Sequence, residues 1–402
     1  MRRAAVVTES LISLVFAVFS YGNSAGLAEA ATGSQLNPCA APNEIASSFE
    51  ETAWQIWVAA TCPVNSDQYP FVVWENWIEQ AQLFPIDPSN GLKVPNSGAT
   101  TGTHILHSSP LTVALSPDLA MTVPGLLGAP DAKCNKAKAP PPGQPNLIFC
   151  EEVRLNGPAE DYIAGTNLWN RTTQAQAAAN GDDIEFPRPA VEFKVDWTLL
   201  NSIGLDCNHL PDEFTTHPVH IETIHGNCFA MTGMHVMSKL IDKWIWATFE
   251  TQNSITNPNR CKDLGCFDPF GSRPAKSNGR DTKLSRRLEQ LMDAANLAPE
   301  WKNYRLDGVQ TDYFSPKLLQ NSVIEGENAA IPANQASCTT CHDLSSVKSD
   351  GTDGLTLLQA LPADPVGFPQ PLPSKAWLRR DFVWSLLLAC PGANSHFNPC
   401  AP

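Results

Sequence analysis

Two cysteines and a histidine near the end of the chain have the spacing Cys338-x-x-Cys341-His342. Residues three apart on a helical turn face the same side, so both sulfurs could form thioethers with the two vinyl groups of one haem. His342 follows directly and could ligate the iron from that face. The chain has 12 cysteines and nine histidines among 402 residues, and about 0.01 chance matches are expected at that composition. The motif therefore predicts one covalent haem c.

A disulfide and half of a zinc site are the other roles open to such a cysteine pair. A zinc site needs further ligands at matching spacing. A thioredoxin-type redox pair needs a βαβ setting. Neither is evident around Cys338, so haem attachment is the preferred interpretation.

The motif leaves open the iron ligand opposite His342. Electron-transfer cytochromes c commonly use a methionine there, but no methionine follows Cys341 and the only later histidine is His396. One upstream stretch of seven residues holds four candidates: Met231, Met234, His235 and Met237.

We take His235 as the candidate distal ligand, because imidazole is a strong ligand for haem iron. The alternatives are the three methionines of the same stretch or an open iron site. With an open site, Glu192 and Lys239 are polar residues that could serve near the haem.

A second group of metal-ligating residues lies within 22 residues. Its members are Cys207, His209, His217, His220, His225 and Cys228. In an exported chain, a disulfide between the two cysteines would remove both thiolates. His217, His220 and His225 would then form either a surface cluster or a second metal site, and the sequence leaves both open.

The first thirty residues have the pattern of an export signal. Arg2 and Arg3 precede an apolar run over residues 11–19, and Ala28-Glu29-Ala30 supplies a small-x-small cleavage site. No later stretch reaches about 18 uninterrupted apolar residues, so no membrane span is predicted after cleavage. We therefore expect a periplasmic or secreted bacterial protein, in a compartment that permits disulfides.

Ten cysteines remain outside the haem motif, and they fall into pairs of near neighbours. The pairs are Cys39 with Cys62, Cys134 with Cys150, Cys207 with Cys228, Cys261 with Cys266, and Cys390 with Cys400. Five disulfides in this pairing are the hypothesis, and buried free cysteines are the alternative, because sequence alone does not fix connectivity.

The net charge of −14 argues against nucleic acid or an anionic membrane as partner. An acidic surface suits a basic redox partner protein, although acidity also serves solubility alone. The mature chain, 402 − 30 = 372 residues, is long enough for one elaborate domain or two.

Apolar spacing predicts helices over residues 43–60, 71–84, 281–297, 316–325 and 377–389, and strands over 191–197, 229–237 and 244–250. Along 191–197 the alternation predicts one buried and one solvated face, and the second strand should place Phe229, Met231, Gly233, His235 and Met237 on one face. Residues 85–149 are rich in turn residues and predict long loops, with His104 and His107 exposed. The haem motif should begin a short helix, and the last helix should cover the haem.

The expected fold class is α+β: loop-rich and disulfide-stapled, with a small β-sheet packed with helices and a cytochrome-c-like helical haem-binding region near the C-terminus. The predicted divisions are the signal peptide at 1–30, a helical and loop region at 31–150, a strand-rich region at 151–275 and a helical haem-binding region at 276–402. One integrated domain over 31–402 is the alternative.

Several segments besides the haem motif resemble uncharacterised bacterial exported single-haem cytochrome c family proteins. The segments are Ala53-Trp54-Gln55, Val73-Trp74-Glu75-Asn76-Trp77, Val191 to Trp197, Gly233-Met234-His235-Val236, Trp244 to Glu250, Cys338 to His342, and Asp381-Phe382-Val383-Trp384. The family often has a histidine after the Trp-Ala-Thr-Phe-Glu segment, where this chain has Thr251. The resemblance implies a haem protein and supplies no reaction.

The leading functional hypothesis is periplasmic transfer of single electrons through one covalent haem. A haem enzyme or small-molecule sensor with an open distal iron site is the alternative, because a simple carrier needs far fewer residues than this chain has. A structural redox subunit of a larger complex is the third hypothesis.

Overall fold

The computed structural model describes residues 37–64, 71–84, 104, 106, 120–122, 133–224, 226–355, 357 and 366–389. These residues belong to one compact unit, Asn37–Pro402. The predicted signal peptide, His107, His225, His396 and the Cys390–Cys400 pair lie outside the described residues. Within the described ranges, no helix has both the length and the apolar character needed to cross a membrane.

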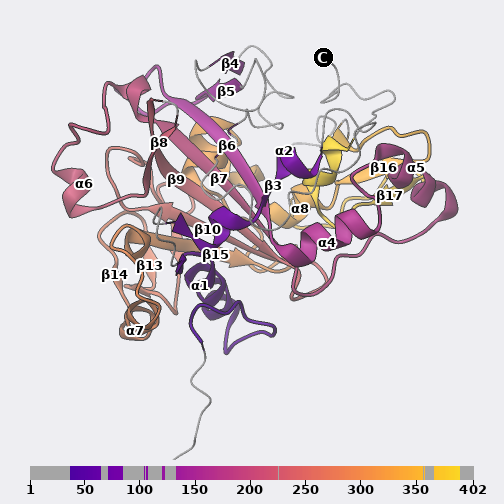
Figure 1. Cartoon of the computed structure of the whole chain (residues 1–402), viewed down its shortest axis with the longest axis horizontal. Helices are drawn as coiled ribbons and strands as arrows, with labels where there is room; N and C mark the ends of the chain where they lie inside the picture. Colours follow the sequence, from indigo (N-terminus) through magenta and orange to yellow (C-terminus); the bar gives the residue numbers. More distant parts are fainter. Residues whose placement is uncertain are drawn as a thin grey trace, which may run out of the picture. The chain divides into compact units, whose positions relative to one another are not determined.

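An antiparallel sheet forms the centre of the molecule, with strand order β15-β10-β9-β7-β6-β5-β4 and with β3 paired to β6 and β8 to β9 (Figure 1). Its strands are β3 (Ile78–Glu79), β4 (Ala120–Thr122), β5 (Lys133–Lys136), β6 (Ile148–Leu155), β7 (Val191–Leu199), β8 (Ile221–Ile224), β9 (Asn227–Ser238), β10 (Ile245–Thr251) and β15 (Tyr304–Gln310). The three predicted strands and the α+β class are confirmed.

One face of the sheet packs against helices α1 (Phe49–Ala60) and α7 (Arg286–Ala294) in the larger apolar core. Figure 1 shows α1 next to β10 and β15. The rings of Trp57 and Phe249 stack there with centroids 4.4 Å apart. The Ser48 hydroxyl caps α1 by accepting from the Glu51 backbone N–H at 3.1 Å, which satisfies one free donor of the first turn.

The opposite face of the sheet, called the polar side below, is also buried, and it carries charged side chains among apolar ones. Side chains alternate along a strand, so β7 turns Glu192, Lys194 and Asp196 to this face, and Glu192 and Asp196 are almost fully buried. The π-helix η6 (Ser322–Asn328) covers part of the face, with Asn328 Nδ2 2.8 Å from Asp196 Oδ2. The prediction that this face of the strand is solvated was therefore wrong, because segments distant in sequence lie over it.

The residues of β9 that were expected to share one face lie on both faces of the sheet, because the register shifts within the strand. The pairing of β9 with β7 shifts between Asp196 and Trp197, so that Gly233 and Met231 are consecutive partners and Thr232 is skipped. A bulge of this kind turns the residues on its two sides to different faces. Met231 consequently joins the core beside α1, whereas His235 and Met237 face the polar side.

The predicted helix over 71–84 was wrong. The segment forms β2 (Phe71–Val72), η1 (Val73–Asn76), β3 and α2 (Gln80–Leu83). Arg154 Nη1 donates to the carbonyls of Glu75 at 2.6 Å and Trp77 at 3.0 Å, and Ile78 pairs with Leu155 in the sheet. These contacts occupy backbone groups that a continuous helix would bond internally, so tertiary pairing overrides helical spacing.

Other helix predictions held only in part. The helix predicted over 281–297 is α7 over Arg286–Ala294, and the Ser285 side chain caps it. The predicted helix over 316–325 appears as η6 over Ser322–Asn328. The predicted last helix is interrupted, with strand β17 (Trp377–Arg379) followed by the 3-10 turn η8 (Trp384–Leu388).

Shorter elements complete the described chain. They are β1 (Pro63–Val64), α4 (Gly157–Gly165), α5 (Arg171–Asn180), η4 (Leu200–Ile203), α6 (Glu213–Thr216), β11 (Cys266–Phe267), β12 (Ser272–Arg273), β13 (Lys276–Ser277), β14 (Lys283–Leu284), η5 (Trp301–Asn303), η7 (Ala333–Gln335), α8 (Cys338–His342) and β16 (Ser346–Lys348).

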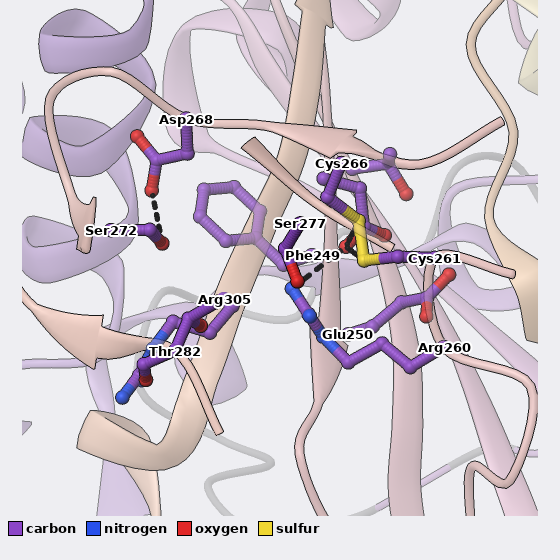
Figure 2. A network of polar contacts seen from close by, with 12 residues as sticks. Phe249, Glu250, Arg260, Cys261, Cys266, Asp268, Ser272, Ser277, Thr282 and Arg305 are labelled. Carbon is purple, nitrogen blue, oxygen red and sulfur yellow. Dashed lines mark hydrogen bonds and ion pairs between the residues drawn. A yellow bond between two sulfur atoms is a disulfide. The ribbon is translucent and has the colours of Figure 1, made fainter. Parts of the chain in front are cut away.

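Four disulfides join the predicted neighbours: Cys39–Cys62, Cys134–Cys150, Cys207–Cys228 and Cys261–Cys266. Figure 2 shows the Cys261–Cys266 bridge beside Arg260 and Glu250. Asp307 lies close to both sulfurs of that bridge, but disulfide sulfurs carry no thiolate charge, so this group lacks the donors of a thiolate metal site.

Candidate functional site

The five-residue helix α8 (Cys338–His342) borders a cavity of about 300 Å³. Cys338, Cys341 and His342 all line it. The helix is fixed at its start, because Gln310 Oε1 at the end of β15 accepts from the Thr339 backbone N–H at 2.9 Å. The three residues of the predicted haem motif therefore open on one space.

Cys338 and Cys341 are free thiols, whereas the eight other described cysteines are bridged. Burial raises the pKa of Cys341 to about 11 and that of Cys338 well above its usual range. Both sulfurs are consequently protonated at neutral pH. A protonated, buried thiol is a poor redox nucleophile, which disfavours the thioredoxin interpretation of the pair.

His342 is held in one orientation by the chain that follows it. Its Nδ1 lies 2.8 Å from the backbone carbonyl oxygen of Phe382, to which it can donate. Burial lowers the pKa of His342 to about 3, so the ring is neutral. A neutral imidazole whose Nδ1 proton is bound to a carbonyl has its Nε2 lone pair available for a metal.

His235 and Met237 on β9 line the same cavity. His235 Nε2 lies 3.2 Å from Glu325 Oε1 of η6, yet the contact falls outside hydrogen-bond geometry. Burial acts to raise the pKa of Glu325, but His235, the Asn321 backbone N–H and Lys194 together outweigh it and lower that pKa. The structure thus places an ionised carboxylate beside His235 at the cavity wall.

The two remaining methionine candidates, Met231 and Met234, lie in the core on the other side of the sheet. Neither is among the described residues that line the cavity.

Strands β6 and β7 add further ionisable groups to the cavity wall. Lys194 Nζ forms an ion pair with Glu151 Oε2 at 2.7 Å. Glu192 Oε2 accepts from the Ser385 hydroxyl at 2.9 Å, and burial raises the pKa of Glu192 to about 7. This carboxyl can therefore hold or release a proton near neutral pH.

The remainder of the cavity wall is largely apolar. Its apolar lining residues include Val153, Trp246, Leu319, Ile331, Leu355, Leu387 and Leu388. The segment over residues 377–389, predicted to cover the haem, contributes Trp384, Ser385, Leu387 and Leu388. A concave site with apolar walls and a few placed polar groups is typical of cofactor pockets.

Most of the ionisable residues in the cavity wall were not predicted from the sequence. Glu192 was singled out and lines the cavity, but Glu151 and Lys194 were not, although strand alternation places them on the same face. Glu325 had no motif around it. Lys239 instead pairs with Asp381 at 2.6 Å and is not among the described lining residues.

The second predicted cluster does not come together in the described chain. The Cys207–Cys228 disulfide removes both thiolates. His217 lies 3.4 Å from both Glu213 and Asp281, whereas His220 lies beside Glu75 and Glu222.

His104 was expected to be exposed, and that prediction was wrong. Its Nδ1 lies 3.0 Å from Glu152 Oε2, and the imidazole is buried next to Trp197. The buried carboxylate of Glu152 needs cationic or hydrogen-bonding partners, which explains why this loop histidine is drawn into the core.

Comparison with family models, curated proteins and solved structures finds no match to this chain. What the protein does must therefore be inferred from its own residues.

Proposed function

We propose that this chain is an exported c-type haem protein that transfers single electrons through one covalent haem, bound at Cys338, Cys341 and His342. The observation that carries the proposal is that these three residues, already in haem-attachment spacing, open together on one cavity. Bound there, the haem would supply an iron that alternates between the ferric and ferrous states by gain and loss of one electron.

The thiols and the imidazole at the cavity have the chemistry that haem c attachment needs. Attachment of haem c requires two free thiols, each adding its S–H across a vinyl C=C bond, and Cys338 and Cys341 are the free thiols of the described chain. The Phe382 carbonyl holds His342 with Nε2 available. Trp246 packs against the imidazole, with ring centroids 4.4 Å apart, so the proximal ligand would be orientated before the iron is bound.

Two residues are candidates for the distal iron ligand: His235 is the first choice and Met237 the second. Both line the cavity, but Glu325 Oε1 lies close to the Nε2 of His235. Ligation through that nitrogen would require Glu325 to move, whereas ligation through Met237 would leave the His235–Glu325 pair in place. The net charge of −14 supports a basic protein as redox partner.

Optical spectra of the exported protein test this function. For a carrier, the oxidised and reduced forms should be six-coordinate and low-spin, and carbon monoxide should leave the reduced spectrum unchanged. His235→Ala and Met237→Leu each remove one distal candidate. Loss of the low-spin spectrum in one variant identifies the ligand, and the other variant is its matched control.

A haem enzyme or small-molecule sensor is the second candidate function. It is favoured by the ionisable wall, because Glu192 and the His235–Glu325 pair are groups that can supply or accept protons beside a molecule bound at iron. Such a protein would bind carbon monoxide readily in the reduced state. That result in the wild type would refute the carrier and support this alternative.

A further inference from the structure

Glu75, His220 and Glu222 bring three metal-binding atoms together away from the haem-motif cavity. One carboxylate oxygen of each glutamate and one ring nitrogen of His220 all lie within 4.8 Å of one another. They come from η1, from the residue just before β8 and from β8 itself. His220 packs against Trp197 and Trp301, which belong to the core on the sheet face opposite the cavity.

The distances between the three atoms fit a coordination shell. His220 Nε2 is 3.1 Å from Glu75 Oε1 and 3.4 Å from Glu222 Oε1. In a tetrahedral site with bonds of about 2.1 Å, ligand atoms are about 3.4 Å apart. His220 Nε2 and Glu75 Oε1 are both buried without a hydrogen-bond partner, so each has bonding capacity left for an ion.

The buried negative charge of this group also favours a bound cation. Glu75 is 98% buried, with 2% of its surface exposed, and its second oxygen already accepts from the Val72 backbone N–H at 2.7 Å. A second carboxylate within 4.8 Å is repulsive unless a cation lies between the two. A protonated His220 would place one positive charge 3.1 Å and 3.4 Å from the two carboxylates, whereas a divalent ion would balance both of them.

We propose that Glu75, His220 and Glu222 bind one divalent transition-metal ion of the Zn²⁺ class. Imidazole nitrogen and carboxylate oxygen are ligands that suit Zn²⁺. Three protein ligands leave a fourth position for water, on the side where the Glu222 side chain is 34% exposed. The ion would tie η1 to the β8–β9 hairpin, and the site is independent of haem.

Zinc titration of the exported, chelator-treated protein tests the site by calorimetry. The wild type should bind one Zn²⁺ per chain, and Zn²⁺ should raise its melting temperature because the folded state alone holds the site. Glu222→Gln is the principal variant, since a one-third exposed side chain tolerates an isosteric change. Its affinity should fall by more than the roughly 10–100-fold that loss of an outer-shell partner costs. His220→Gln should abolish binding.

His209→Gln is the matched control, because His209 is an exposed histidine beside Asp206 and outside the site. It should bind zinc as the wild type does. The proposal is overturned if the wild type shows no saturable zinc binding, if Glu222→Gln keeps wild-type affinity, or if His209→Gln weakens binding as much as Glu222→Gln does.

Discussion

Replacing Glu192 with glutamine should change how the stability of the protein depends on pH. Glu192 lies at the cavity wall, almost fully buried, and its partner is the Ser385 hydroxyl, which also contacts Gln80 Oε1. Burial raises the pKa of Glu192 from 4.5 to about 7 in the folded protein, and Ser385 and Lys194 offset only part of that rise. In the unfolded chain the carboxyl has its ordinary pKa.

The direction in which stability changes with pH follows from the number of protons that each state binds. Between about pH 4.5 and 7 the folded state holds a proton on Glu192 that the unfolded state has lost, so stability falls as pH rises through this window. A difference of about 2.5 pKa units corresponds to about 3 kcal/mol in full. Between about pH 5 and pH 8 the loss from Glu192 alone should be roughly 2 kcal/mol.

Urea denaturation at the two pH values measures this effect. The wild type should lose roughly 2 kcal/mol more than Glu192→Gln on going from the lower to the higher pH. Glu44→Gln, at an exposed position, is the control and should behave as the wild type does. Equal pH dependence in the wild type and Glu192→Gln would refute the inference that burial raises the pKa of this carboxyl to about 7.

Two further substitutions test the packing and the bridges. A Cβ on Gly233 would lie 2.8 Å from Asn321 Oδ1, so Gly233→Ala should displace η6 and lower the unfolding free energy by about 1–3 kcal/mol. Gly157 has open space around it, so Gly157→Ala is the control and should not lower the unfolding free energy. Equal urea midpoints for the two variants would contradict the close packing at Gly233. Replacing Cys207 and Cys228 with serine should lower the unfolding free energy by about 3 kcal/mol, because the bridge closes a separation of 21 residues; an unchanged midpoint would count against the bridge.

Local patterns in the sequence predicted the features that depend on near neighbours. Strict alternation over residues 191–197 predicted β7, and short separations predicted Cys134–Cys150 and three other bridges correctly. The haem-motif helix also forms where it was expected. These features depend on contacts within a strand, a turn or a short loop, which single-sequence patterns report.

Features set by distant segments could not be predicted in this way. Glu192 and Asp196 looked solvent-facing because nothing in their own strand indicates that η6 and the 377–389 segment lie over them. Glu325 lies close to His235 although it is 325 − 235 = 90 residues later in the chain. The 71–84 segment had helical spacing, but pairing with β6 and the donors of Arg154 fixed another backbone.

The central claim is that Cys338 and Cys341 carry one covalent haem with His342 on its iron. The most direct test is the intact mass, under denaturing conditions, of the protein exported from a bacterium that attaches haem c. The mature chain should be heavier by one haem, on the peptide that holds Cys338 and Cys341, and Cys338→Ser with Cys341→Ser should remove it. A wild-type chain of unmodified mass, with these two sulfurs free or bridged to each other, would contradict the claim.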